Sequence, residues 1–85
     1  MKEVKYVLTD PDGIHARPAG EFINLIKELG VSVTIRLGDK KADAGKIFEI
    51  MKLGAMRGDE LKFLISGTDE EKASESIEAF LKDNL

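Results

Sequence analysis

The chain has 85 residues, of which 42% are hydrophobic and 34% charged, the composition of one small globular domain covering residues 1–85. It contains no cysteine, which excludes disulfides and zinc–thiolate clusters, and no apolar run long enough to predict a membrane span. A net charge of −3 disfavours nucleic acid as a partner, and without a visible signal peptide we expect a cytoplasmic protein.

The first third of the sequence predicts a strand followed by a helix. Alternating apolar residues predict the strand over about residues 3–8, and the turn sequence Asp10-Pro11-Asp12-Gly13 ends it. Apolar residues then recur at helical spacing over residues 16–29, and Gly30 ends that pattern. The helix is therefore expected to begin at or just after His15.

The rest of the sequence predicts three strands and two helices. Alternation predicts strands over residues 31–37 and 60–65, and a tight turn after the first of these predicts a short edge strand over about 40–43. Apolar residues at helical spacing predict a short helix over about 47–53. A last helix is expected to begin at the capping box formed by Thr68 and Glu71.

The element order β-α-β-β-α-β-α predicts an α+β fold of two layers. In this open-faced sandwich, three helices cover one antiparallel-rich, four-stranded sheet. Because the helices are amphipathic and the sheet has one apolar face, the two layers would enclose a single core.

His15 is the only histidine and the candidate reactive residue. A lone histidine is more often a solvated residue without a functional role, but this one directly precedes a helix. The backbone N–H groups of Ala16 and Arg17 have no intrahelical acceptor there, and helix N-termini bind anions. A phosphoryl group on a ring nitrogen would meet those N–H groups, and the planar guanidinium of Arg17 could bind two of its oxygens. The alternative for Arg17 is a solvated charge on the first helical turn.

The chain resembles the histidine-containing phosphocarrier (HPr) family of the bacterial phosphoenolpyruvate-dependent sugar phosphotransferase system. The resemblance rests on the run Gly13-Ile14-His15-Ala16-Arg17-Pro18-Ala19, on the segment from Ile47-Phe48 to Leu53-Gly54 and on the element order. The resemblance covers essentially the whole chain. It implies a carrier rather than an enzyme, in which His15 accepts a phosphoryl group, on Nδ1 by the family pattern. The donor would be phosphorylated Enzyme I and the acceptors Enzyme IIA-type domains, with Arg17 stabilising the phosphate. No cofactor or metal is expected.

The short second helix is the candidate partner surface. One short helix cannot bury every apolar side chain over residues 47–53, so some should be exposed, and an exposed apolar patch with methionine is typical of a partner surface. The alternative is that these apolar side chains pack into the core. The resemblance implies that Ile47, Phe48 and Met51 bind Enzyme I, Enzyme II domains and regulatory proteins, with Gly20 and Asn24 at the rim.

Two residues depart from the family pattern. Lys46 stands where Gram-positive relatives carry a regulatory serine, so serine-linked regulation is not expected. Asp12 replaces a small neutral residue, and its carboxylate would oppose a phosphoryl group if it faced His15 rather than its own turn. Both departures favour the alternative of an HPr-like regulatory adaptor with little or no phosphoryl transfer. A carrier that must change partners is expected to be a monomer.

Overall fold

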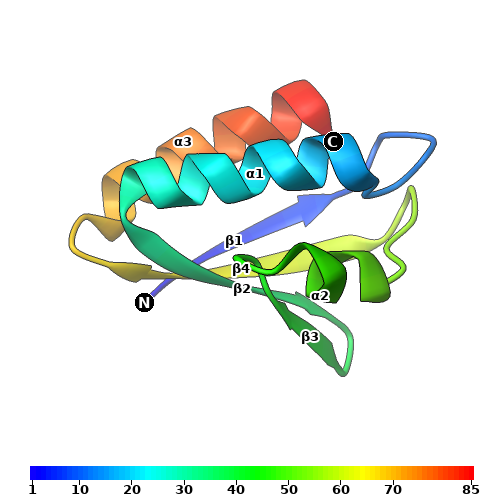
Figure 1. Cartoon of the computed structure of the whole chain (residues 1–85), viewed down its shortest axis with the longest axis horizontal. Coiled ribbons are helices and arrows are strands. Elements are labelled where there is room, and N and C mark those ends of the chain that lie inside the picture. The colour runs from blue at the N-terminus through cyan, green and yellow to red at the C-terminus, as the bar shows by residue number, and fades with distance from the viewer.

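A four-stranded antiparallel sheet forms one layer of the protein in the computed structural model, which describes residues 1–85 (Figure 1). The strands are β1 (Lys2–Val7), β2 (Val31–Leu37), β3 (Lys40–Asp43) and β4 (Glu60–Gly67), and they lie in the order β1-β4-β2-β3. In the register, Phe63 on β4 lies opposite Val4 on β1 and Ile35 on β2. All three side chains are buried, so alternate positions form one apolar face of the sheet.

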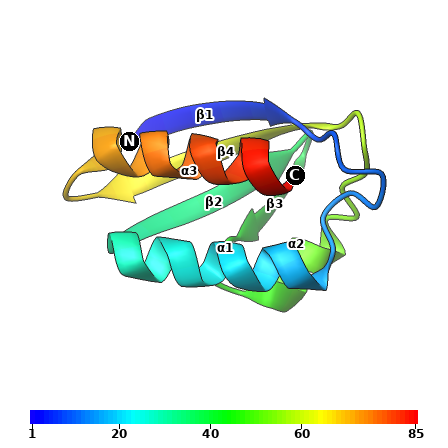
Figure 2. The ribbon, with the colours of Figure 1, turned by 90° about the horizontal axis from the view of Figure 1, so that it is seen from above.

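The helices α1 (Ala16–Leu29) and α3 (Glu70–Asn84) cover that apolar face, and the short helix α2 (Ile47–Lys52) lies beside the amino-terminal half of α1 (Figures 1 and 2). Phe22 of α1 packs edge-on against Phe63 with ring centroids 5.7 Å apart, and against Phe80 of α3 at 5.5 Å. These contacts join both long helices to the sheet in one core. None of the helices has the length and apolarity that a membrane span requires.

The predicted fold and most predicted elements are confirmed. α1 begins directly after His15, and Gly30 ends it in the left-handed conformation with φ 67°, donating its N–H to the Lys27 carbonyl. The predicted hairpin pairs β2 with β3, which is an edge strand as expected. The first strand is shifted by one residue relative to the predicted 3–8.

The predicted capping box is wrong. The N-cap of α3 is Asp69, whose Oδ1 accepts a hydrogen bond from the Lys72 N–H at 3.1 Å. β4 extends to Gly67, because that residue still pairs with Val31, so the helix begins later than the Thr68 position implies. Aspartate caps a helix at least as well as threonine, so the shift leaves the helix start capped.

Candidate functional site

His15 lies at the junction between the β1–α1 loop and α1. Its backbone is extended, with φ −120° and ψ 174°, and its carbonyl accepts the Ala19 N–H at 3.1 Å, so it is the N-cap residue of the helix. Its side chain makes no capping hydrogen bond and is 42% exposed. The imidazole is therefore available to a partner, beside the first-turn N–H groups that the helix leaves free.

Gly13 holds this loop against the connection between α2 and β4. It has φ 64°, and a side chain there would overlap the Ala55 carbonyl oxygen and approach the Met56 Cα to 3.0 Å. The same Ala55 carbonyl accepts the Ile14 N–H at 3.2 Å. Only glycine allows the two backbones to approach this closely, so Gly13 determines where the loop places His15.

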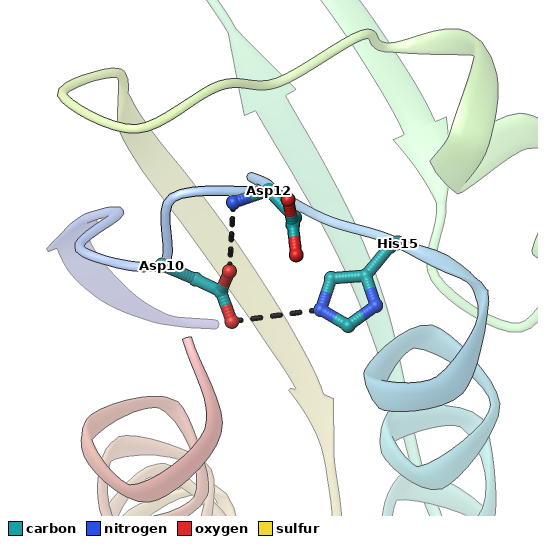
Figure 3. Close-up of side chains that lie close together, drawn as sticks. All are labelled: Asp10, Asp12 and His15. Carbon is teal, nitrogen blue, oxygen red and sulfur yellow. Dashed lines mark hydrogen bonds and ion pairs between the residues drawn. The ribbon is translucent and has the colours of Figure 1, made fainter.

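Asp10 is the residue whose carboxylate pairs with the His15 ring (Figure 3). Its Oδ2 lies 3.5 Å from His15 Nε2, and its Oδ1 accepts the Asp12 N–H at 2.8 Å. The hydrogen bond from Asp12 lowers the pKa of the Asp10 carboxyl below its usual value; partial burial opposes this shift, and the interaction with His15 adds to it. Asp10 is therefore an ionised carboxylate beside the imidazole at neutral pH.

The lowered pKa of Asp10 predicts a pH-dependent contribution to stability. A carboxyl whose pKa is lower in the folded than in the unfolded chain stabilises the fold above the unfolded value, near 3.8, and the contribution is lost as pH falls through the folded value. We expect Asp10→Asn to lower the free energy of unfolding at neutral pH, and the difference from wild type to disappear in more acidic solution. Urea unfolding across this pH range measures it. A difference that grew on acidification would contradict the assignment.

Asp12 lies in the same turn but makes no ion pair or side-chain hydrogen bond with His15. One ligand atom each from Asp10, Asp12 and His15 nevertheless lies within 4.8 Å of the others. These are atoms that a divalent cation can bind, although such ions usually take more ligands than three. The Asp12 carboxylate is thus near the His15 ring, but it is the Asp10 carboxylate that contacts the ring directly.

Arg17 points along α1 rather than pairing with a residue of the loop. Its Nε lies 3.4 Å from Glu21 Oε1, one turn further on, and its side chain is 88% exposed. The first turn of α1 contains no acidic residue, so no carboxylate of that turn competes for the Ala16 and Arg17 N–H groups. An anion that reached this end of the helix would find two free backbone donors and an exposed guanidinium within one turn.

The exposed apolar residues of α2 form a second feature, which we call the α2 surface (Ile47, Phe48 and Met51). Phe48 is 82% and Met51 39% exposed, while Ile47 is half-buried and Ile50 is in the core. The prediction that this helix leaves apolar side chains exposed is confirmed for Phe48 and Met51. On α1, Gly20 is half-buried and Asn24 exposed.

Lys46 is the N-cap of α2, and its side chain does not cap the helix. Its Nζ lies 3.7 Å from Glu49 Oε2, while the other oxygen of Glu49 accepts the Asp43 N–H at 2.9 Å. Asp43 in turn accepts the Gly45 N–H at 2.8 Å. The start of α2 is thus held by Asp43 and Glu49, which leaves Lys46 as an exposed cation beside the α2 surface.

The chain is similar to known proteins in sequence and in fold. The family model described as "PTS HPr component phosphorylation site" matches residues 2–83. The chain belongs to the HPr family. Phosphocarrier protein HPr of Lysinibacillus sphaericus is 30% identical over 95% of this chain and 92% of its own length. The crystal structure of HPr-C-His from Thermoanaerobacter tengcongensis has a TM-score of 0.88 at 31% identity, covering 98% of this chain and 93% of that one. HPr-like segments also occur inside larger proteins, since the multiphosphoryl transfer protein of Haemophilus influenzae is 28% identical over 98% of this chain, which spans 17% of that protein.

Two residues near the loop that carries His15 are not marked as candidates by the sequence. The sequence marks Asp10 only as a turn residue, although the turn that it begins returns the chain toward His15 and is closed by a hydrogen bond from the Gly13 N–H to the Asp10 carbonyl. Met56, 56% exposed in the loop after α2, has its backbone against Gly13. No periodicity marks Met56, because it lies in neither a helix nor a strand.

Proposed function

We propose that this chain is a phosphoryl carrier in a phosphoenolpyruvate-dependent phosphotransferase system, acting as a monomer in the cytoplasm. His15 accepts the phosphoryl group from phosphorylated Enzyme I and passes it to sugar-specific Enzyme II components, through their IIA-type domains. One observation carries the proposal: His15 is the N-cap residue of α1, its imidazole is accessible, and the ring makes no capping hydrogen bond. Membership of the HPr family supports the same function.

The transfer needs few groups from this chain. Nδ1 of His15 attacks phosphorus in line with the leaving group, and the N–H groups of Ala16 and Arg17 bind the phosphoryl oxygens at the positive end of α1. The α2 surface, with Gly20 and Asn24 at its rim, binds the partner, which supplies the remaining groups. Because Lys46 has no hydroxyl, phosphorylation at this position does not regulate the surface.

Arg17 is proposed to stabilise the phosphoryl group after leaving Glu21. A surface pair of this kind contributes only about 0.3–0.5 kcal/mol, so the guanidinium is easily released. We expect Glu21→Gln to lengthen the half-life of the phosphorylated protein by up to about twofold, and Arg17→Ala to shorten it. Hydrolysis of the purified phosphoprotein, followed by intact mass, measures both. Equal half-lives for wild type and Arg17→Ala would remove Arg17 from the site.

The proposal is tested by phosphorylation of the whole chain. Incubation with phosphoenolpyruvate and an Enzyme I that phosphorylates a known HPr in parallel is expected to add one acid-labile phosphoryl group per chain. His15→Ala is expected to add none while keeping its circular dichroism spectrum. No adduct on the wild-type chain, with the parallel HPr fully modified, would refute the carrier function.

A second candidate function is an HPr-like adaptor that binds partners with little phosphoryl transfer. The carboxylates of Asp10 and Asp12 near His15 favour it, since negative charge opposes an incoming phosphoryl group. The adaptor predicts equal partner affinity for wild type and His15→Ala together with negligible adduct. Stoichiometric phosphorylation in the experiment above decides against it.

A further inference from the structure

We propose that Asp10 is a positioning residue for His15: its carboxylate holds the proton on Nε2 and so leaves Nδ1 as the nitrogen that accepts the phosphoryl group. The inference rests on the proposed function of His15 and goes beyond it, because it explains which ring nitrogen reacts. No other ionisable side chain pairs with the ring.

The geometry of the ring carries the proposal. Nε2 is the nitrogen near Asp10 Oδ2, at 3.5 Å, and Nδ1 lies on the opposite side of the ring, away from both aspartates (Figure 3). An ionised carboxylate only accepts hydrogen bonds, so a favourable contact requires a proton on Nε2. In a neutral imidazole the other nitrogen then carries the free lone pair.

The Asp10 carboxylate is held in place rather than free to rotate. Oδ1 accepts the Asp12 N–H at 2.8 Å, which aims Oδ2 at the ring. The Asp10 main chain accepts the Gly13 N–H at 3.0 Å and donates to the Leu85 carbonyl at 2.9 Å, and Leu85 is buried. A side chain of which 24% is exposed, held by one hydrogen bond and carried on a main chain fixed by two more, differs from a mobile surface ion pair.

The same arrangement suits the transfer step. When the Nδ1 lone pair attacks, an N–P bond forms and the bond from phosphorus to the phosphorylated donor protein breaks, its electron pair returning to the donor. The proton on Nε2 stays in place, so the ring acquires positive charge, which the Asp10 carboxylate stabilises as the aspartate of a catalytic triad does. On transfer to an acceptor, the N–P electron pair returns to Nδ1 and the ring is neutral again.

Asp10→Asn separates this role from a structural one. The asparagine oxygen can keep the hydrogen bond from the Asp12 N–H, which turns its NH₂ group toward Nε2. That group is a donor, so it favours a lone pair on Nε2 and a proton on Nδ1. Asp12→Asn is the matched control, because it removes one negative charge from the same turn without touching the Asp10–His15 contact.

The test uses the whole chain labelled with ¹⁵N-histidine. Long-range ¹H–¹⁵N spectra of the neutral ring are expected to show mainly the Nε2–H tautomer in wild type and Asp12→Asn, and mainly the Nδ1–H tautomer in Asp10→Asn. Phosphorylation by Enzyme I and phosphoenolpyruvate is expected to slow by about tenfold or more in Asp10→Asn, and by less than about twofold in the control.

An unchanged tautomer ratio in Asp10→Asn, or an equal change in Asp12→Asn, would overturn the proposal. The spectra require no partner protein. They therefore test the role of Asp10 even if the wild-type chain accepts no phosphoryl group. That second result would refute the carrier function but not the effect of Asp10 on the tautomer of His15.

Discussion

Replacing Gly13 with alanine is expected to lower the free energy of unfolding by about 2–4 kcal/mol. The left-handed backbone at φ 64° accounts for part of this cost, because L-residues with a side chain rarely adopt it. The larger part comes from the overlap between the new methyl group and the Ala55 carbonyl, which is main chain and cannot rotate away. Relief of that overlap would also displace the loop that positions His15, so phosphorylation should slow as well.

Gly20→Ala is the matched control for this substitution. Gly20 lies inside α1 with nothing within 4 Å of an added Cβ, so alanine there is expected to stabilise the protein by up to about 1 kcal/mol. Urea unfolding followed by circular dichroism compares the two variants with wild type. If Gly13→Ala unfolded at the wild-type urea concentration, the close approach of the loop to Ala55 would be refuted.

Replacing Phe48 with alanine is expected to weaken Enzyme I binding by about 30-fold, or roughly 2 kcal/mol, the loss typical of an aromatic hot spot. The ring is 82% exposed in the free protein, so a partner that covered it would bury a large apolar area that folding leaves open. For the same reason, the free energy of unfolding should change by less than about 0.5 kcal/mol. Loss of affinity without loss of stability is the signature of a docking residue.

Val7→Ala provides the comparison for Phe48. Val7 is a similarly apolar side chain, 47% exposed, on the edge strand β1 at the opposite side of the sheet from β3. Titration calorimetry with Enzyme I is expected to give wild-type affinity for this variant. If both variants bound equally well, the α2 surface would not be the docking site. A large fall in the stability of Phe48→Ala would show that the ring contributes to the core.

The negative charges around His15 lie on one side of its ring. The carboxylates of Asp10 and Asp12 lie on the Nε2 side, and the start of α1 follows His15 directly in the chain (Figure 3). In the proposed mechanism, negative charge faces the nitrogen that keeps its proton, while the free N–H groups of the helix are left for the phosphoryl oxygens. The acidic turn then assists the ring instead of only repelling the phosphate.

The features that depend on local spacing could be predicted from the sequence. Alternation and helical periodicity are properties of neighbouring residues, so they located the strands and α1, and with them the place of His15 at a helix start. The family motif lies in one continuous run around that residue, which is why the family was also identified from the sequence.

Other features depend on segments that are far apart in the sequence and meet only in the folded chain. Gly13 contacts Ala55, far along the chain, and the end of the Val31–Gly67 pairing set the cap of α3 at Asp69. Periodicity did not show which apolar residues of α2 are exposed, because the answer depends on what packs against that helix. The orientation of Asp10 likewise follows from a turn whose hydrogen bonds close only when the loop is folded. Local spacing therefore located His15 as the candidate phosphoryl acceptor, and packing between distant segments determined its surroundings.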